Sequence, residues 1–172
     1  MLIDETFFTG ELHIDGLIDT AGVPSATTEA IKAELISLCN LYESRFYRES
    51  LGEVAAKEFV QYLNTEGANP VEKWENLKSM LVEKIGNDVY SPVAYYIYFF
   101  YLRKNQVQST PLGTMSEESS KVVPCNIKMI NSWNQMVYMN TYLARWLYEH
   151  KNDYGGYYFD DSLLESINAF GI

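Results

Sequence analysis

The segment 93–102 constrains the fold most, because all ten of its residues are apolar or aromatic. Ser91 and Pro92 precede it, and Arg103 and Lys104 follow it, a pattern typical of the start and the end of a helix. A helix that is apolar on every side is buried on most sides, although a short apolar run also fits a buried strand. We favour a central core helix. Ten residues are too few to cross a bilayer, which takes about 20.

Other parts of the chain carry apolar residues at three- and four-residue steps, which indicates amphipathic helices. The pattern predicts helices over residues 28–46, 51–64, 70–85 and 124–150. Ser50 and Glu53 have the spacing of a capping box at the start of the second, and Gly86 is expected to end the third. Asp160 or Asp161 is expected to cap a last short helix.

These elements predict a mainly α fold: a single helical-bundle domain of about five helices, residues 1–172. Residues 1–24 are expected to form an extended arm, because glycines interrupt any helical period there. Residues 25–151 form the helical body, and residues 152–172 a tail with the short helix. Residues 105–123 show no periodicity and are rich in Ser and Thr. We expect a surface loop there, and loops of this length are usually functional or disordered.

The charge of the chain is −10, and the excess of acid lies at both ends. Residues 1–24 and 152–172 contain Asp and Glu but no Lys or Arg. Nucleic-acid binders concentrate Lys and Arg, because phosphate contacts supply most of their affinity, so we expect no direct sequence-specific binding of nucleic acid. The acidic ends either keep the protein in solution or meet basic or neutral protein surfaces. The acidic start also differs from a secretory signal, which begins basic.

The sequence predicts no catalytic, metal or cofactor site. His13 and His150 are far apart in the sequence, and no Cys or His pair has zinc spacing. Neither a phosphate-binding loop nor a nucleophile elbow is present. Cys39 lies beside an apolar helical stripe and is expected in the core. Cys125 is at a helix start, which favours a thiolate, but the sequence places no histidine near it.

Six segments, taken in order, resemble a known family. They are FFTGEL at 7–12, YESRF at 42–46 followed by LG at 51–52, the aromatic helix 91–103, Thr110 with Gly113, WNQM at 133–136, and INAFGI at 167–172. The family consists of phage and prophage proteins of gut bacteria. They are thought to be virion structural proteins of the helical head–tail connector type.

The resemblance implies a protein that assembles into a homo-oligomeric ring and contacts other virion proteins. It would be located in the host bacterial cytoplasm during assembly and then in the virion, with no membrane partner. The alternatives are a small helical module that binds an unknown protein and, less expected, an unrecognised enzyme. A ring component should show exposed aromatic patches and elements that project from the body.

The candidate assembly contacts are the large apolar residues of the arm and of the loop. They are Phe7, Phe8, Leu12, Pro111, Leu112 and Met115. The arm carries too many large apolar groups to leave in water. It can dock onto a neighbouring subunit, or it can fold back onto its own helices.

Overall fold

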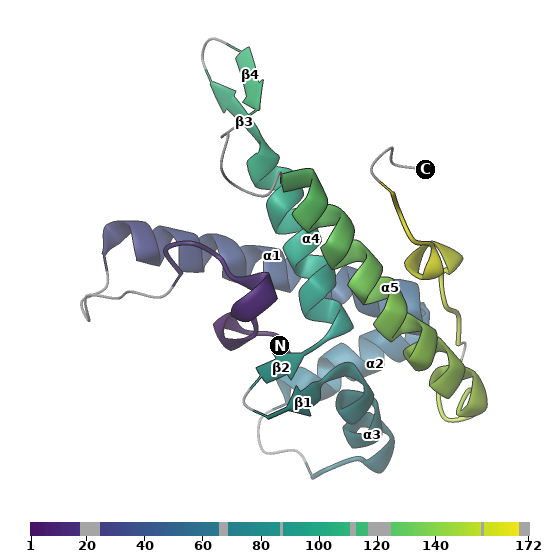
Figure 1. Ribbon diagram of the computed structural model, residues 1–172. Helices are drawn as coiled ribbons and strands as arrows, with labels where there is room; N and C mark the ends of the chain where they lie inside the picture. Colours follow the sequence, from purple (N-terminus) through teal and green to yellow (C-terminus); the bar gives the residue numbers. More distant parts are fainter. Residues whose placement is uncertain are drawn as a thin grey trace.

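The computed structural model describes residues 1–17, 25–65, 69–86, 88–110, 113–116, 125–155 and 157–168. This part of the chain is mainly helical, as predicted, with five α-helices (Figure 1). They are α1 (Ala26–Leu51), α2 (Glu53–Asn64), α3 (Glu72–Leu81), α4 (Pro92–Gln106) and α5 (Cys125–Glu149). Three short 3-10 helices are η1 (Glu5–Phe7), η2 (Gly10–Leu12) and η3 (Asp161–Leu164). Buried apolar side chains from residue 3 to residue 163 form one connected core.

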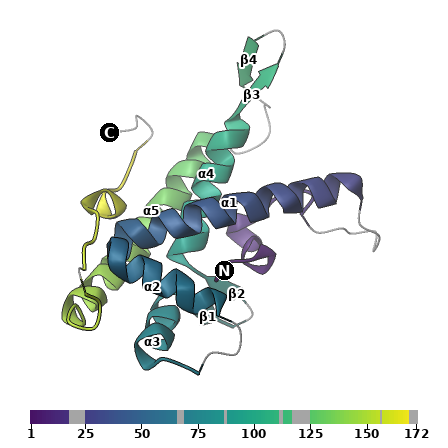
Figure 2. The ribbon, with the colours of Figure 1, turned by 180° about the vertical axis from the view of Figure 1, so that it is seen from behind.

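Helix α4 is at the centre of this core. It packs along α5, and α1 crosses it on another side (Figures 1 and 2). Every residue from Val93 to Phe99 is buried, and Phe100 is half-buried. The prediction of a central, buried helix is therefore confirmed.

Three buried tyrosines of α4 each donate the hydroxyl to an acceptor on another segment. Tyr95 donates to Glu11 Oε2 at 3.0 Å, and Tyr96 donates to Glu49 Oε2 at 2.8 Å. Tyr98 donates to the backbone carbonyl of His13 at 3.2 Å. A buried polar group without a partner costs free energy, so these bonds make an aromatic core helix possible.

Residues 1–17 fold back onto the helices of their own chain, which corrects the prediction of an extended arm there; residues 18–24 of the predicted arm lie outside the described residues. The backbone of this segment forms η1 and η2, and its large apolar side chains are buried. These are Ile3, Phe7, Phe8, Leu12, Ile14 and Leu17. Helix η1 contacts α1 and η2 contacts α4, so the segment lies against both helices (Figure 2).

The junction between α1 and α2 differs from the predicted capping box. Helix α1 continues to Leu51, and Ser50 is buried in its last turn rather than at an N-cap. Its hydroxyl has no hydrogen-bond partner within the described part of the chain. The chain turns instead at Gly52, whose φ of 80° is open to glycine but strained for other residues. Tyr47 and Leu51 extend the buried stripe of α1. Their burial stabilises the longer α1 more than a capping box at Ser50 would stabilise the start of α2.

The end of α3 is also earlier than predicted. Strand β1 (Glu83–Ile85) follows it and pairs antiparallel with β2 (Asp88–Tyr90), with Ile85 opposite Asp88. Gly86, with φ of +63°, therefore lies in a hairpin turn rather than at a helix C-cap. Ile85 was expected on the buried face of the helix, but it is 56% exposed. The positive φ of Gly86 suits the turn of a tight β-hairpin.

Part of the predicted loop 105–123 is ordered as secondary structure. Helix α4 extends to Gln106, and β3 (Val107–Thr110) then pairs antiparallel with β4 (Gly113–Ser116). The hairpin projects away from the helical body (Figure 1). The sequence pattern missed it because neither strand has an apolar face that alternates with a polar one. The rest of that predicted loop, residues 111–112 and 117–123, lies outside the described residues.

The tail packs along α5, so it belongs to the same core. Asp160 caps η3 by accepting a hydrogen bond from the backbone N–H of Ser162 at 2.9 Å, which confirms the first of the two predicted caps. Asn134 makes two hydrogen bonds with the backbone of Ile167, both at 2.9 Å. Asn140 donates to the carbonyl of Leu163 at 3.0 Å. These polar residues of α5 bind the backbone of the tail and add to the burial of Leu163 in the core.

Candidate functional site

The outer face of α5 presents aromatic side chains to solvent. Tyr138 and Tyr142 are 58% and 52% exposed, and Ile127 lies on the same side of the helix. The two tyrosine rings are 5.2 Å apart, edge to face, and their hydroxyl oxygens are 3.1 Å apart. The opposite side of α5, with Met136 and Leu143, is buried. We name Ile127, Tyr138 and Tyr142 the α5 tyrosine face.

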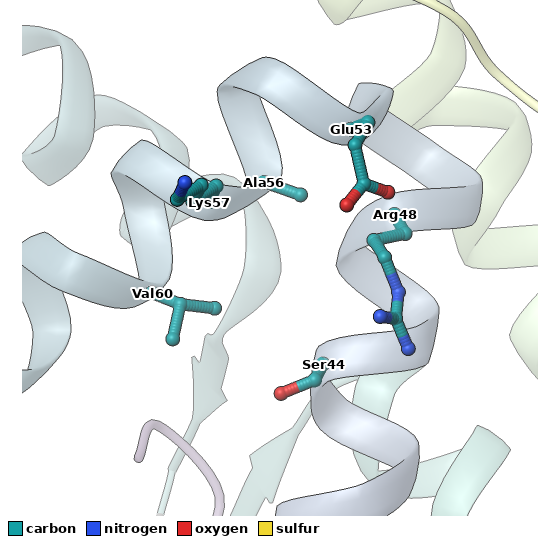
Figure 3. Close-up of a pocket in the computed structure, with 6 residues that line it drawn as sticks. All are labelled: Ser44, Arg48, Glu53, Ala56, Lys57 and Val60. Atoms are coloured by element: carbon teal, nitrogen blue, oxygen red, sulfur yellow. The ribbon is translucent and has the colours of Figure 1, made fainter.

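A hollow of about 180 Å³ lies between α1 and α2. Ser44 and Arg48 line it from α1, and α2 contributes four further residues (Figure 3). These are Glu53, Ala56, Lys57 and Val60. The turn at Gly52 brings the two helices together here. Arg48 and Lys57 form no ion pair with any residue that the structure describes.

A smaller hollow of about 120 Å³ lies between the N-terminal segment and β2. Its main polar groups, Glu11 and the hydroxyl of Tyr95, are hydrogen-bonded to each other. Burial and this bond raise the pKa of Tyr95, so its hydroxyl is a donor at neutral pH. The pair serves to attach η2 to α4.

Glu43 is a buried carboxylate that sequence reasoning missed. Its Oε1 accepts hydrogen bonds from the N–H groups of Leu2 at 2.6 Å and Ile3 at 3.0 Å, and from the Tyr47 hydroxyl at 3.1 Å. Its pKa is raised, because burial disfavours the charged form more than these bonds favour it. The spacing of Cys39, Glu43 and Tyr47 on one helical stripe was the available signal. Glu43 positions the start of the chain on α1.

Cys39 lies in the core, as the sequence predicted. Its side chain is almost fully buried, and burial followed by the charge of Glu43 raises the pKa of the thiol to about 12. The thiol is therefore neutral at physiological pH, and a thiolate nucleophile is disfavoured there. The side chain of Cys125 lies outside the described residues.

We expect Glu43 to make the stability of the fold depend on pH. Its pKa in the folded chain is above its ordinary value of 4.5, so the folded chain keeps a proton that the unfolded chain has released. The contribution of this group to the free energy of unfolding is therefore largest below pH 4.5, and it falls as the pH rises through the folded pKa. Glu43→Gln, which keeps the shape without the titration, should remove this fall. Urea unfolding of both proteins between about pH 4 and pH 8 measures the difference; two parallel profiles would contradict it.

The structure corrects half of the candidate assembly contacts. Phe7, Phe8 and Leu12 are buried within their own chain, so in this arrangement they cannot contact a neighbouring subunit. The physical reason for this burial is that helices α1 and α4 of the same chain cover the apolar groups of the arm. Pro111 and Leu112 lie outside the described residues. The backbone of Met115 pairs with Gln108 in the projecting hairpin.

The two histidines of the chain each lie beside a different partner in the structure. His13 lies beside Asp15, with 3.2 Å between the nitrogen and the carboxylate oxygen, and His150 stacks on Trp146. Within the described ranges, no three His, Cys, Asp or Glu side chains gather as a metal site would require. Among the helices that the structure describes, none has the length and apolarity to cross a membrane.

Comparisons with known proteins found no matching family model, no similar curated protein and no similar solved structure.

Proposed function

We propose that the chain is a structural assembly protein, of the phage or prophage head–tail connector type that the sequence resembles. It acts through contacts with copies of itself and with other virion proteins. The observation that carries this proposal is the α5 tyrosine face. Large aromatic side chains are enriched in protein interfaces, where the ring is buried and the hydroxyl keeps a hydrogen bond.

The setting of the α5 tyrosine face suits an interface. Helix α5 is held from behind by α4 and along one side by the tail, through Asn134 and Asn140. The tyrosines are thus presented on a supported helix, which reduces the entropy lost on binding. The hairpin β3–β4 projects from the end of α4 (Figure 2) and supplies a second element beyond the body. A ring needs two different surfaces per subunit, because its contacts are head to tail.

The test is the oligomeric state of a chain that lacks the two rings. Tyr138→Ser with Tyr142→Ser should weaken self-association at least about tenfold, since aromatic residues at interface centres contribute most of the binding energy. Size-exclusion chromatography with light scattering over a range of concentrations measures the shift. Circular dichroism checks that the helices are intact.

The matched control is Tyr158→Ser, which removes a tyrosine that is 59% exposed but lies in the tail. It should leave self-association unchanged. A wild-type chain that stays monomeric at about 100 μM, above typical interface Kd values, would contradict self-assembly. An equal effect of Tyr158→Ser would show that the α5 tyrosine face is not the contact.

A further inference from the structure

The hollow between α1 and α2 has charges that its own chain does not use. Five cations, Lys32, Arg45, Lys73, Lys78 and Lys104, each form an ion pair with a glutamate, and five others of the described residues, Lys84, Arg103, Lys128, Arg145 and Lys151, form none. Arg48 and Lys57 form none within the described part of the chain, although both line one concave site. Glu53 lies beside Arg48, with its carboxylate directed toward it, and Lys57 lies farther along α2, beyond Ala56 (Figure 3). The three groups together carry one net positive charge.

This charge balance selects the ligand. A single carboxylate neutralises the site, whereas a phosphate dianion would leave excess negative charge beside Glu53 on a chain of net charge −10. We propose that the hollow binds the carboxylate side chain of an acidic peptide segment in a partner protein. Arg48 and Lys57 hold the carboxylate, and Glu53 limits the site to one negative charge.

The remaining residues of the hollow fit the rest of such a side chain. The Ser44 hydroxyl points into the space and can donate a hydrogen bond to a carboxylate oxygen (Figure 3). Ala56 and Val60 point into it from α2 and offer apolar contact to side-chain methylenes. The volume of about 180 Å³ accommodates one side chain rather than a helix or a nucleotide. These residues lie on α1 and α2, so the site is independent of the α5 tyrosine face.

The test uses a small peptide and the intact chain. The probe is the tetrapeptide Ala-Glu-Glu-Ala, acetylated and amidated, with Ala-Gln-Gln-Ala as its uncharged counterpart. In ¹⁵N–¹H NMR titrations, the acidic probe should shift the amide signals of Ser44, Ala56 and Val60, and the uncharged probe should not. Binding of the acidic probe should be tighter than binding of inorganic phosphate.

Substitutions then assign the roles. Arg48→Gln with Lys57→Gln should weaken binding of the acidic probe by about 4- to 25-fold, because each exposed ion pair contributes roughly 2- to 5-fold. Lys84→Gln with Arg103→Gln is the control, because it removes the same charge from exposed positions outside the hollow. It should change binding less than about twofold, within the range of weak exposed charges. Glu53→Gln should tighten binding of the acidic probe and of inorganic phosphate, with the larger gain for phosphate.

Three results would overturn the proposal. The first is the absence of shifts around the hollow at any probe concentration. The second is an equal loss of binding in the control pair, which would show a general charge effect. The third is tighter binding of inorganic phosphate than of the acidic probe by the wild-type chain, which would assign the hollow to phosphate groups. Because the readout is peptide binding, failure here leaves the oligomeric test of the α5 tyrosine face unaffected.

Discussion

A chain that lacks residues 1–24 is expected to lose its cooperative fold. The segment buries Phe8 and Ile3 completely and Phe7, Leu12, Ile14 and Leu17 nearly so. Emptying a single packed Phe site typically costs about 3–5 kcal/mol, and a whole domain is stable by only about 5–15 kcal/mol. Removing the segment also exposes the apolar surfaces of α1 and α4 that it covers. The remaining helices therefore lack enough buried surface.

Urea unfolding followed by circular dichroism, with light scattering for the oligomeric state, measures this result. The full-length chain should show one sharp transition, and the 25–172 chain a broad one or none. Phe8→Ala should fall between them and keep a sharp transition at lower urea. A truncated chain with native helicity and unchanged cooperativity would contradict the fold-back arrangement, and the loss of assembly alone would restore the docking interpretation.

Replacing Phe99 with alanine is expected to lower the free energy of unfolding by about 3–5 kcal/mol, the usual cost of emptying a buried aromatic site. Phe99 lies where α4 meets α5, with its ring 4.8 Å from that of Trp133 and 5.2 Å from that of Phe100. The neighbouring helices cannot close the space without moving the whole contact. Chemical denaturation gives the difference from the urea midpoint at constant slope.

The matched control for Phe99 is Tyr158→Ala, which removes an aromatic side chain of similar size from an exposed position. Such surface changes usually alter stability by less than about 0.5 kcal/mol. A loss below about 1 kcal/mol for Phe99→Ala, well under the range for buried aromatics, would show that α4 is not packed as described.

The glutamine variant of Glu43 gives a different kind of information from these two changes. It tests a single buried carboxyl group of α1 that binds the start of the chain, and it changes the pH dependence of stability rather than the core packing. Glu43→Gln changes the attachment of the N-terminal backbone to α1, whereas the 25–172 chain and Phe99→Ala remove buried apolar side chains. Comparison of the three therefore separates these two contributions to stability.

Local sequence determined the elements whose signals do not depend on distant residues. The segment 93–102 has no polar side to place in water, so a buried helix was predictable from those residues alone. Asp160 was predictable as a cap because its bond to Ser162 spans only two residues. The helical stripe of α5 was likewise readable, and so was the burial of Cys39.

The candidate site was less predictable. An exposed tyrosine and a buried one look alike in a sequence, since Tyr96 and Tyr138 differ only in what packs against them. The hollow of Arg48 and Lys57 depends on how α1 and α2 meet at Gly52, which the sequence pattern placed incorrectly. The proposed contacts Phe7 and Phe8 were identified as anchors, but their partner proved to be their own chain.

Tertiary structure alone decided the features that depend on competition between local and distant contacts. Ser50 and Glu53 satisfy the local rule for a helix start, yet burial of Tyr47 and Leu51 carries α1 past Ser50, and α2 begins at Glu53 after the turn at Gly52. Glu43 is tolerated in the core only because Leu2 and Ile3, some forty residues away, bring donors to it. Local sequence thus specified which segments are helical and which residues are apolar. The fold specified what each apolar face covers, because burial is a property of pairs of segments that are distant in the chain.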